Sequence, residues 1–176
     1  MKNELLEIMP EFNLIQDQTL REKALNIWEY AIERNQWRME DLLDMPFTLL
    51  IENPPANILT HTKAVTLTSL KIAEVMIDTY RERVNINQDY LIAGALLHDV
   101  GKLFEFKKEK GKFVKSQSGK MLRHPISGAA LAYKFDLPDE IVHIIAAHSK
   151  EGDTVKRSIE AVIVHHADFV NFETFK

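Results

Sequence analysis

The sequence contains no cysteine among its 176 residues, which excludes disulfide bonds, thiolate zinc sites and a cysteine nucleophile. It also lacks any apolar run of about 18 residues, the length that a membrane helix requires. The first six residues carry charged side chains and no apolar signal core, so we predict no secretion signal. Internal repeats and low-complexity segments are absent as well. These absences fit a cytoplasmic protein without membrane partners.

The residues that are present suit an ordinary globular domain. Of the chain, 45% is hydrophobic and 27% is charged, which is enough apolar material to build a core without cross-links. A length of 176 residues suits one domain and leaves little room for two. We therefore expect residues 1–176 to form a single domain.

The charge of the chain is unevenly distributed. The net charge is −4. Between Lys102 and Arg123, however, seven lysines and one arginine against two glutamates give +6, which leaves −10 for the remaining residues. Such a basic strip suggests an anionic partner. The alternative is a solvated hairpin that uses lysines to guard its edges.

The spacing of apolar residues predicts a mostly helical chain with one β-hairpin. Asn87 is a good N-cap and Gly101 a good C′ residue for one of the helices. The hairpin is expected around residues 103–121, with a turn at Lys110-Gly111-Lys112. The predicted helical segments are residues 1–9, 19–36, 40–43, 58–84, 87–100, a helix from 125 that includes 126–131, and residues 136–148 and 155–169.

The most informative stretch is Leu91–Lys102. Seven residues without a charged or strongly polar side chain lead directly into His98 and Asp99. A helix this apolar is buried on every side. Burying an imidazole and a carboxylate at its end is costly unless a partner satisfies them. The stretch therefore predicts a partner for His98 and Asp99 elsewhere in the chain.

Five segments place a histidine or aspartate at an apolar helix face or a helix end. Successive segments are 20 to 37 residues apart, about one helix plus one loop, so antiparallel helices can bring these side chains together. The residues are His61, His98, Asp99, His124, His148 and Asp168. Imidazoles and carboxylates suit Fe, Mn, Co, Ni or Zn and match calcium poorly. Six ligands fit two divalent ions with open positions better than one, with Asp99 as a bridge.

With this set, and with the run His98-Asp99-Val100-Gly101-Lys102, the chain resembles the HD-domain superfamily of metal-dependent phosphohydrolases. The likeness covers about residues 57–172 and is to the two-metal branch, H…HD…H…H…D. It implies an all-α HD bundle, with residues 1–50 as an extra N-terminal helical extension. It also implies that His61, His98, Asp99 and Asp168 hold one ion, whereas Asp99, His124 and His148 hold the second.

The resemblance further implies a phosphomonoesterase or phosphodiesterase acting on a nucleotide or a related phosphorylated metabolite. A hydroxide bridging the ions would attack phosphorus. Asp99 and Lys102 are the candidate catalytic residues, and Lys102 is also a candidate phosphate contact, its alternative role being a cation at a helix C-terminus. Arg123 is a second candidate anion contact. His165 shares a helix face with Asp168 and is a candidate substrate-facing residue.

Other hypotheses remain open at this point. A mixed-valent di-iron oxygenase, similar to myo-inositol oxygenase and its phosphonate-cleaving relatives, would use the same ligands. A nuclease or nucleic-acid-binding module would use the lysine-rich hairpin along a phosphate backbone. A non-catalytic regulatory HD domain is disfavoured, because such proteins tend to lose ligands and this sequence keeps all six. The sequence does not indicate the oligomeric state.

Overall fold

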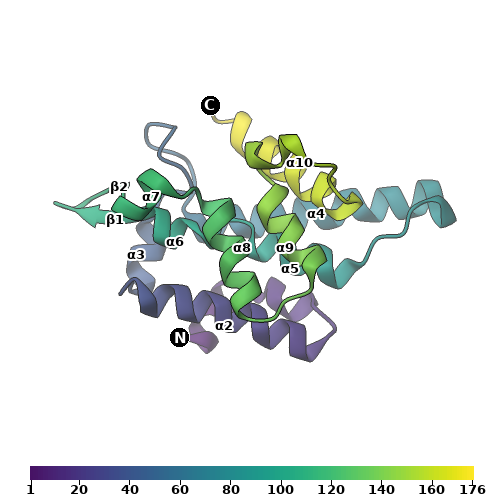
Figure 1. Ribbon diagram of the computed structural model, residues 1–176, viewed down its shortest axis with the longest axis horizontal. Helices are drawn as coiled ribbons and strands as arrows, with labels where there is room; N and C mark the ends of the chain where they lie inside the picture. The colour runs from purple at the N-terminus through teal and green to yellow at the C-terminus, as the bar shows by residue number, and fades with distance from the viewer.

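The computed structural model describes all residues from Met1 to Lys176, and Figure 1 shows a helical assembly with a small hairpin at one end. The α-helices are α1 (Lys2–Ile8), α2 (Gln18–Arg34), α3 (Met39–Asp44), α4 (Ile58–Tyr80), α5 (Gln88–Leu97), α6 (Lys102–Glu105), α7 (Gln117–Met121), α8 (His124–Lys134), α9 (Asp139–Ala147) and α10 (Ile159–Glu173). Short 3-10 helices are η1 (Pro10–Leu14), η2 (Arg81–Arg83) and η3 (Lys150–Thr154). The strands are β1 (Phe106–Glu109) and β2 (Lys112–Lys115). The predicted all-α class with one hairpin is confirmed.

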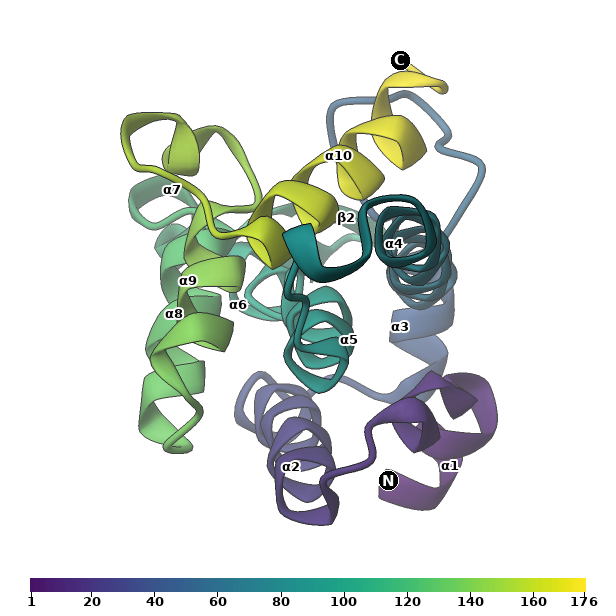
Figure 2. The same cartoon turned by 90° about the vertical axis from the view of Figure 1, so that its right-hand side faces the viewer.

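Helix α5 lies at the centre of the molecule, between α2, α4, α9 and α10 (Figure 2). All seven residues from Leu91 to Leu97 are buried. Leu91 and Ala95 pack with residues of α4 and α10, whereas Ile92 and Leu96 belong to the larger core that includes α1, α2 and α8. The apolar run thus has a partner on every side, as its composition predicts.

The N-terminal segment is joined to the rest of the chain by two tryptophans, of which Trp28 is buried and Trp37 is half-buried. Trp28 of α2 donates from its indole nitrogen to the carbonyl of Leu96, at 2.9 Å. Trp37 donates in the same way to the carbonyl of Leu103, at 2.8 Å. Both indoles bury a large apolar surface while satisfying their one polar atom. Residues 1–50 therefore cover α5 and α6.

The segment from Met45 to Ile58 forms a closed loop between α3 and α4. Its ends are joined by backbone hydrogen bonds from Ile58 N to Met45 O at 2.8 Å and from Phe47 N to Ala56 O at 3.4 Å. This closure brings the buried ring of Phe47 against the first turns of α4, where it stacks on His61.

The end of α5 differs from the sequence prediction. Helix α5 ends at Leu97 rather than near Gly101, and Gly101 has φ −62°, a right-handed value, at the start of α6. The assignment of Gly101 as a left-handed C′ residue is therefore wrong. A Cβ at Gly101 would lie 2.1 Å from the carbonyl oxygen of His124. Close approach of two backbones, not conformational freedom, requires glycine here.

The hairpin is shorter than residues 103–121. Strands β1 and β2 pair antiparallel, with Phe106 opposite Lys115 and Glu109 opposite Lys112. The two-residue turn has positive φ at both positions, 51° at Lys110 and 76° at Gly111, as expected of a type I′ turn. Helices α6 and α7 occupy the rest of the predicted range, and the Ser116 hydroxyl caps α7 by accepting from Gly119 N at 2.9 Å.

Other helix boundaries also differ from the prediction, because side-chain caps or a residue with positive φ place them elsewhere. Helix α2 begins at Gln18 rather than at residue 19, because the Asp17 side chain caps it by accepting from Leu20 N. Helix α4 ends at Tyr80 rather than Val84, since Arg81 takes φ 49°. Helix α10 begins after Ser158, whose hydroxyl accepts from Ala161 N, and not at residue 155. No helix is both long and apolar enough to cross a membrane.

Two glycines provide a test of the turn that carries His98 and Asp99. We expect Gly101→Ala to lower the free energy of unfolding by about 3 kcal/mol, because the new methyl group meets backbone atoms that cannot move aside. Gly111→Asn is the matched control and should cost less than about 1 kcal/mol, since asparagine tolerates positive φ and nothing lies near that Cβ. Urea unfolding measures both, and equal losses would contradict the close-approach explanation.

Candidate metal centre

The six predicted ligands come from five separate segments and meet at one place. In chain order they are His61 in the first turns of α4, His98 and Asp99 just after α5, His124 at the start of α8, His148 just after α9, and Asp168 in α10. All but Asp168 are buried. The structure therefore assembles the residues that the sequence spacing selects.

The first group lies around one oxygen of Asp99. His61, His98 and Asp99 place one potential ligand atom each within 4.8 Å of one another. The Oδ2 atom of Asp99 is 3.5 Å from His61 Nε2 and 3.3 Å from His98 Nε2. Asp168 Oδ1 completes the group at 3.0 Å from His61 Nε2 and 3.9 Å from His98 Nε2.

The second group lies around the other oxygen of the same carboxylate. Asp99, His124 and His148 again place their ligand atoms within 4.8 Å of one another. Asp99 Oδ1 is 3.3 Å from His124 Nε2 and 3.9 Å from His148 Nε2. Each oxygen of Asp99 thus faces a different pair of imidazoles, which is the geometry expected of a bridging ligand.

Hydrogen bonds at Nδ1 determine which ring nitrogens are free. His98 Nδ1 donates to Ala95 O at 2.6 Å, and His148 Nδ1 donates to Ile145 O at 2.7 Å. Because a carbonyl can only accept, these Nδ1 atoms carry the hydrogen, and the Nε2 atom of each neutral ring presents a lone pair. His98 Nε2 is buried without a hydrogen-bond partner.

His124 follows the same rule through a side-chain acceptor. Its Nδ1 donates to Glu105 Oε2 at 2.8 Å, so its Nε2 also presents a lone pair. That atom lies 3.3 Å from His148 Nε2. Two lone pairs facing each other repel unless a cation accepts both. The arrangement therefore fits a metal ion, and second-sphere hydrogen bonds of this kind are usual for metal-bound histidines.

Burial controls the charge of the imidazoles. It lowers the pKa of His61 and His124, and it lowers the pKa of His148 to about 3. For His98, burial acts in the same direction, but the neighbouring Asp99 outweighs it and raises the pKa. Neutral rings at pH 7 are the form that binds metals.

Both carboxylates remain ionised, although Asp99 is buried and Asp168 is half-buried. Burial alone would raise the pKa of Asp99, but the Lys102 ammonium and His98 hold it well below its usual range. The pKa of Asp168 is likewise lowered against the effect of burial, chiefly by the hydrogen bond with His61. A buried carboxylate with a half-buried carboxylate beside it requires positive charge nearby.

Glu105 takes part in the site but was not among the sequence candidates. Its Oε2 accepts from both the backbone N and Nδ1 of His124, each at 2.8 Å. Burial alone would raise the pKa of Glu105, yet the His124 hydrogen bond lowers it to about 2. The only feature of the sequence that could have indicated this role is the position of Glu105, an acidic residue in a lysine-rich segment, three residues after Lys102.

Lys102 contacts the carboxylate of Asp99 directly. Its ammonium donates to Asp99 Oδ2 and to the carbonyl of Phe47, both at 2.6 Å. The side chain is buried yet lines the pocket beside the metal residues. The structure thus gives Lys102 two fixed partners and leaves its third N–H near the pocket.

The two remaining candidates lie on different sides of the cluster. Arg123 lines the pocket, with its Nε 3.3 Å from Glu151 Oε1. His165 is absent from the pocket lining and lies behind His148, where its Nδ1 donates to the His148 carbonyl at 2.6 Å.

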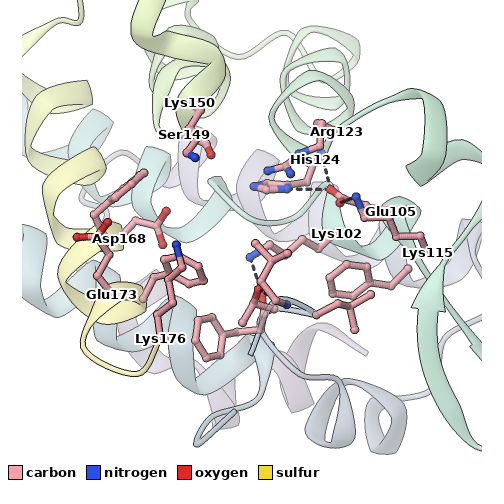
Figure 3. A pocket seen from close by; sticks show the side chains of 17 residues that line it. Lys102, Glu105, Lys115, Arg123, His124, Ser149, Lys150, Asp168, Glu173 and Lys176 are labelled. Carbon is pink, nitrogen blue, oxygen red and sulfur yellow. Dashed lines mark hydrogen bonds and ion pairs between the residues drawn. The ribbon is translucent and has the colours of Figure 1, made fainter. Parts of the chain in front are cut away.

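The pocket above the cluster has a cavity of about 210 Å³. Figure 3 shows Lys102, Glu105 and His124 on one side of it and Asp168 and Glu173 on the other. Five cationic side chains line its polar part, namely Lys102, Lys115, Arg123, Lys150 and Lys176, together with the carboxylates of Glu105, Asp168 and Glu173 and the hydroxyl residues Thr48 and Ser149. Apolar side chains line the rest: Phe47, Leu49, Leu50, Phe106, Phe169 and Phe172.

Comparison with known proteins matches the HD domain family model to residues 58–171. The chain belongs to the HD domain family. The predicted family membership is thereby confirmed, and the matched segment contains all six candidate ligands of the HD domain.

Two curated relatives share part of this HD domain chain. It is 39% identical over 130 residues to dihydroneopterin 2′,3′-cyclic phosphate phosphodiesterase from Methanocaldococcus jannaschii, covering 67% of this chain and 51% of that protein. It is 32% identical over 88 residues to ribonuclease Y from Acidothermus cellulolyticus, covering 50% of this chain and 15% of that protein. The chain thus spans about half or less of these relatives. No solved structure matches it significantly.

Phe47 lies outside the segment matched by the HD domain model, yet it contacts the site. Its ring stacks on His61, with centroids 4.3 Å apart and planes at 19°. Its carbonyl accepts the Lys102 ammonium. Sequence reasoning assigned no role to residues 1–50, since a loop of this kind carries no metal-ligand pattern.

Metal content tests the two groups. We expect protein reconstituted with Mn²⁺ or Co²⁺ to hold two ions per chain by elemental analysis. His148→Ala removes a ligand of one group only and should leave about one ion, whereas Asp99→Ala removes the shared ligand and should lose both. His166→Ala is the control, because His166 is exposed and belongs to neither group. A single ion in the wild type, or two in His148→Ala, would contradict the assignment.

Proposed function

We propose that this HD-domain protein is a metal-dependent phosphohydrolase that cleaves the phosphoric ester of a small, ring-bearing molecule. The observation that carries the proposal is the pair of buried His/Asp groups sharing Asp99 beneath a cation-lined pocket. A 39% identical relative is a cyclic phosphate phosphodiesterase, so a cyclic phosphodiester is the favoured substrate.

The donor atoms define what the site would hold. His61, His98, Asp99 and Asp168 would hold one divalent transition-metal ion, and Asp99, His124 and His148 would hold the second. The nitrogen and oxygen donors suit Fe, Mn, Co, Ni or Zn. When bound, such a pair supplies an activated water as nucleophile and polarises a phosphoryl oxygen.

The chain's own cations would bind and orient the phosphate. Lys102 has one N–H left after its bonds to Asp99 and Phe47. Arg123 and Lys115 line the same side of the pocket as His124. Preorganised donors of this kind stabilise the negative charge that develops on the transferring phosphoryl group.

The apolar part of the pocket would hold the remainder of the substrate. Phe169 and Phe172 follow the ligand Asp168 along α10, and both rings line the pocket. Phe172 also packs edge-on against Phe47, with centroids 6.4 Å apart. Partly exposed aromatic faces bind planar rings well, and the Methanocaldococcus relative acts on a pterin derivative. We therefore infer a planar group on the phosphate ester.

A second candidate function is the hydrolysis of a nucleic acid. Lys115 of β2 lines the pocket, so the lysine-rich hairpin borders the site, and the second relative is a ribonuclease. The overall net charge of −4 opposes this function. An oxygenase would use the same ligands, but neither relative is one.

A cytoplasmic location remains a prediction from the composition.

A substrate panel tests the proposed activity. We expect metal-loaded protein to hydrolyse at least one 2′,3′-cyclic phosphate and a chelator to stop the reaction. Asp99→Asn and His98→Ala should lower kcat/KM at least 10³-fold while circular dichroism stays unchanged. Failure on all cyclic phosphates, nitrophenyl diesters and monoesters, with two ions bound, would contradict the proposal. Salt-sensitive cleavage of an oligonucleotide alone would support the nuclease instead, and consumption of O₂ by an iron-loaded, mixed-valent form would support the oxygenase.

The aromatic side chains that line the pocket, Phe169 and Phe172, lead to a separate prediction; we call them the aromatic wall. We expect Phe172→Ala to raise KM about 10-fold for a ring-bearing cyclic phosphate, since stacking on one ring contributes about 1–3 kcal/mol. The same variant should leave kcat/KM for glycerol cyclic phosphate unchanged. Phe175→Ala is the matched control, because that ring is exposed and lies outside the pocket. Equal losses on both substrates would contradict a ring-binding wall.

A further inference from the structure

Three consecutive backbone carbonyls at the end of α9 each accept a hydrogen bond from a side chain. Arg157 donates from Nε to Ala147 O at 2.7 Å and from Nη2 to Ser149 O at 2.9 Å. His165 donates from Nδ1 to His148 O at 2.6 Å. Arg157 thus binds the carbonyls of the residues before and after the candidate ligand His148, and His165 binds the carbonyl of His148 itself. We call this arrangement the carbonyl clamp.

The clamp supplies donors to carbonyls that a helix end leaves open; Ser149 O also accepts from Gly152 N at 3.0 Å. The last carbonyls of an α-helix have no partner within the helix and usually bond to water or a cap. Here the guanidinium that supplies the donors is largely buried, with 14% of the side chain exposed. A planar guanidinium can reach two carbonyls in one fixed geometry, which a lysine ammonium cannot reproduce.

The clamped turn carries residues into the site. His148 directs its Nε2 toward Asp99 Oδ1, and the next two residues, Ser149 and Lys150, line the pocket. The turn has little room to relax, because a Cβ at Gly152 would lie 2.2 Å from Ala147 O. The hydrogen bond from His148 Nδ1 to Ile145 O sets the rotation of the ring, whereas the clamp sets the position of its backbone.

We propose that Arg157 and His165 are positioning residues that place His148 for the second metal ion. The inference rests on the proposed two-ion site and assigns His165 to the support of a ligand, not to the substrate. It predicts that loss of either donor weakens the ion held by Asp99, His124 and His148 and leaves the other ion in place. Supporting hydrogen bonds of metal ligands typically change affinity 10- to 100-fold.

The variants separate the carbonyl bonds from the other roles of these side chains. Arg157→Lys keeps the charge but loses the two-carbonyl geometry. Asp153→Asn is the matched control, because it removes the exposed ion pair of Arg157, 2.7 Å long, without touching the carbonyls. His165→Asn places its amide nitrogen near the position of Nδ1, whereas His165→Gln places it near Nε2. Only the asparagine variant should therefore retain the donor.

The measurement is metal content and affinity by titration with Co²⁺ alone, followed by absorption spectroscopy and chelator competition. We expect Arg157→Lys and His165→Gln to bind the first ion with wild-type affinity and the second at least 10-fold more weakly. Asp153→Asn and His165→Asn should bind both ions like the wild type. Circular dichroism of each variant establishes that it is folded.

The outcomes distinguish this inference from the proposed function. Wild-type affinity for both ions in Arg157→Lys and His165→Gln would overturn the clamp and leave the proposed function standing. Equal weakening of both ions in the folded variants would also overturn it, since it indicates a general structural role. A wild type that binds fewer than two ions would refute the two-ion site itself. If Arg157→Lys does not fold, the pair His165→Asn and His165→Gln decides the question alone.

Discussion

The carboxylate of Asp99 is buried among four imidazoles and the ammonium of Lys102, with each oxygen facing a different pair of rings. An isolated charge in such a place would be strongly destabilising, so its partners must arrive with it. They come from separate helices, and the packing of α4, α5, α8 and α9 is therefore tied to a single group. Binding a cation in the site and holding the bundle together depend on the same contacts, as in other proteins where metal binding is coupled to folding.

Two of these partners share one local design. His98 and His148 each follow the last residue of a helix, α5 and α9, and each donates from Nδ1 to a carbonyl three residues earlier. The helix end needs a donor, and the histidine needs its hydrogen on Nδ1 for Nε2 to bind a metal. One hydrogen bond satisfies both requirements. The buried apolar helix α5 then serves as a rigid support that ends directly before His98 and Asp99.

The sequence predicted which histidines and aspartates meet at this place, because metal coordination constrains residue type and spacing along the chain. The all-α class and the Lys110-Gly111 turn were also predictable, since periodicity and turn chemistry are local. The supporting residues were not. Glu105 looks like any surface glutamate until α6 and α8 meet, and His165 shares a helix face with Asp168 although its Nδ1 bonds to the far side of His148. Glycine is also required at position 101 because of the backbone of His124, which is 23 residues further along the chain. Such roles depend on tertiary contacts that no local pattern records.

The closed loop between α3 and α4 has a consequence for how this site can diversify. Its ends are joined by hydrogen bonds at Met45–Ile58 and Phe47–Ala56, and the chain between them reaches the pocket through Leu49 and Leu50. Insertions or deletions at the tip would leave both anchors, and therefore α4 and His61, in place. A change in the length of this loop would thus alter the pocket lining without displacing the candidate ligands. Two proteins with the same six candidate ligands could accordingly differ in what they bind, and the length of this loop would be a better guide to that difference than the ligand motif.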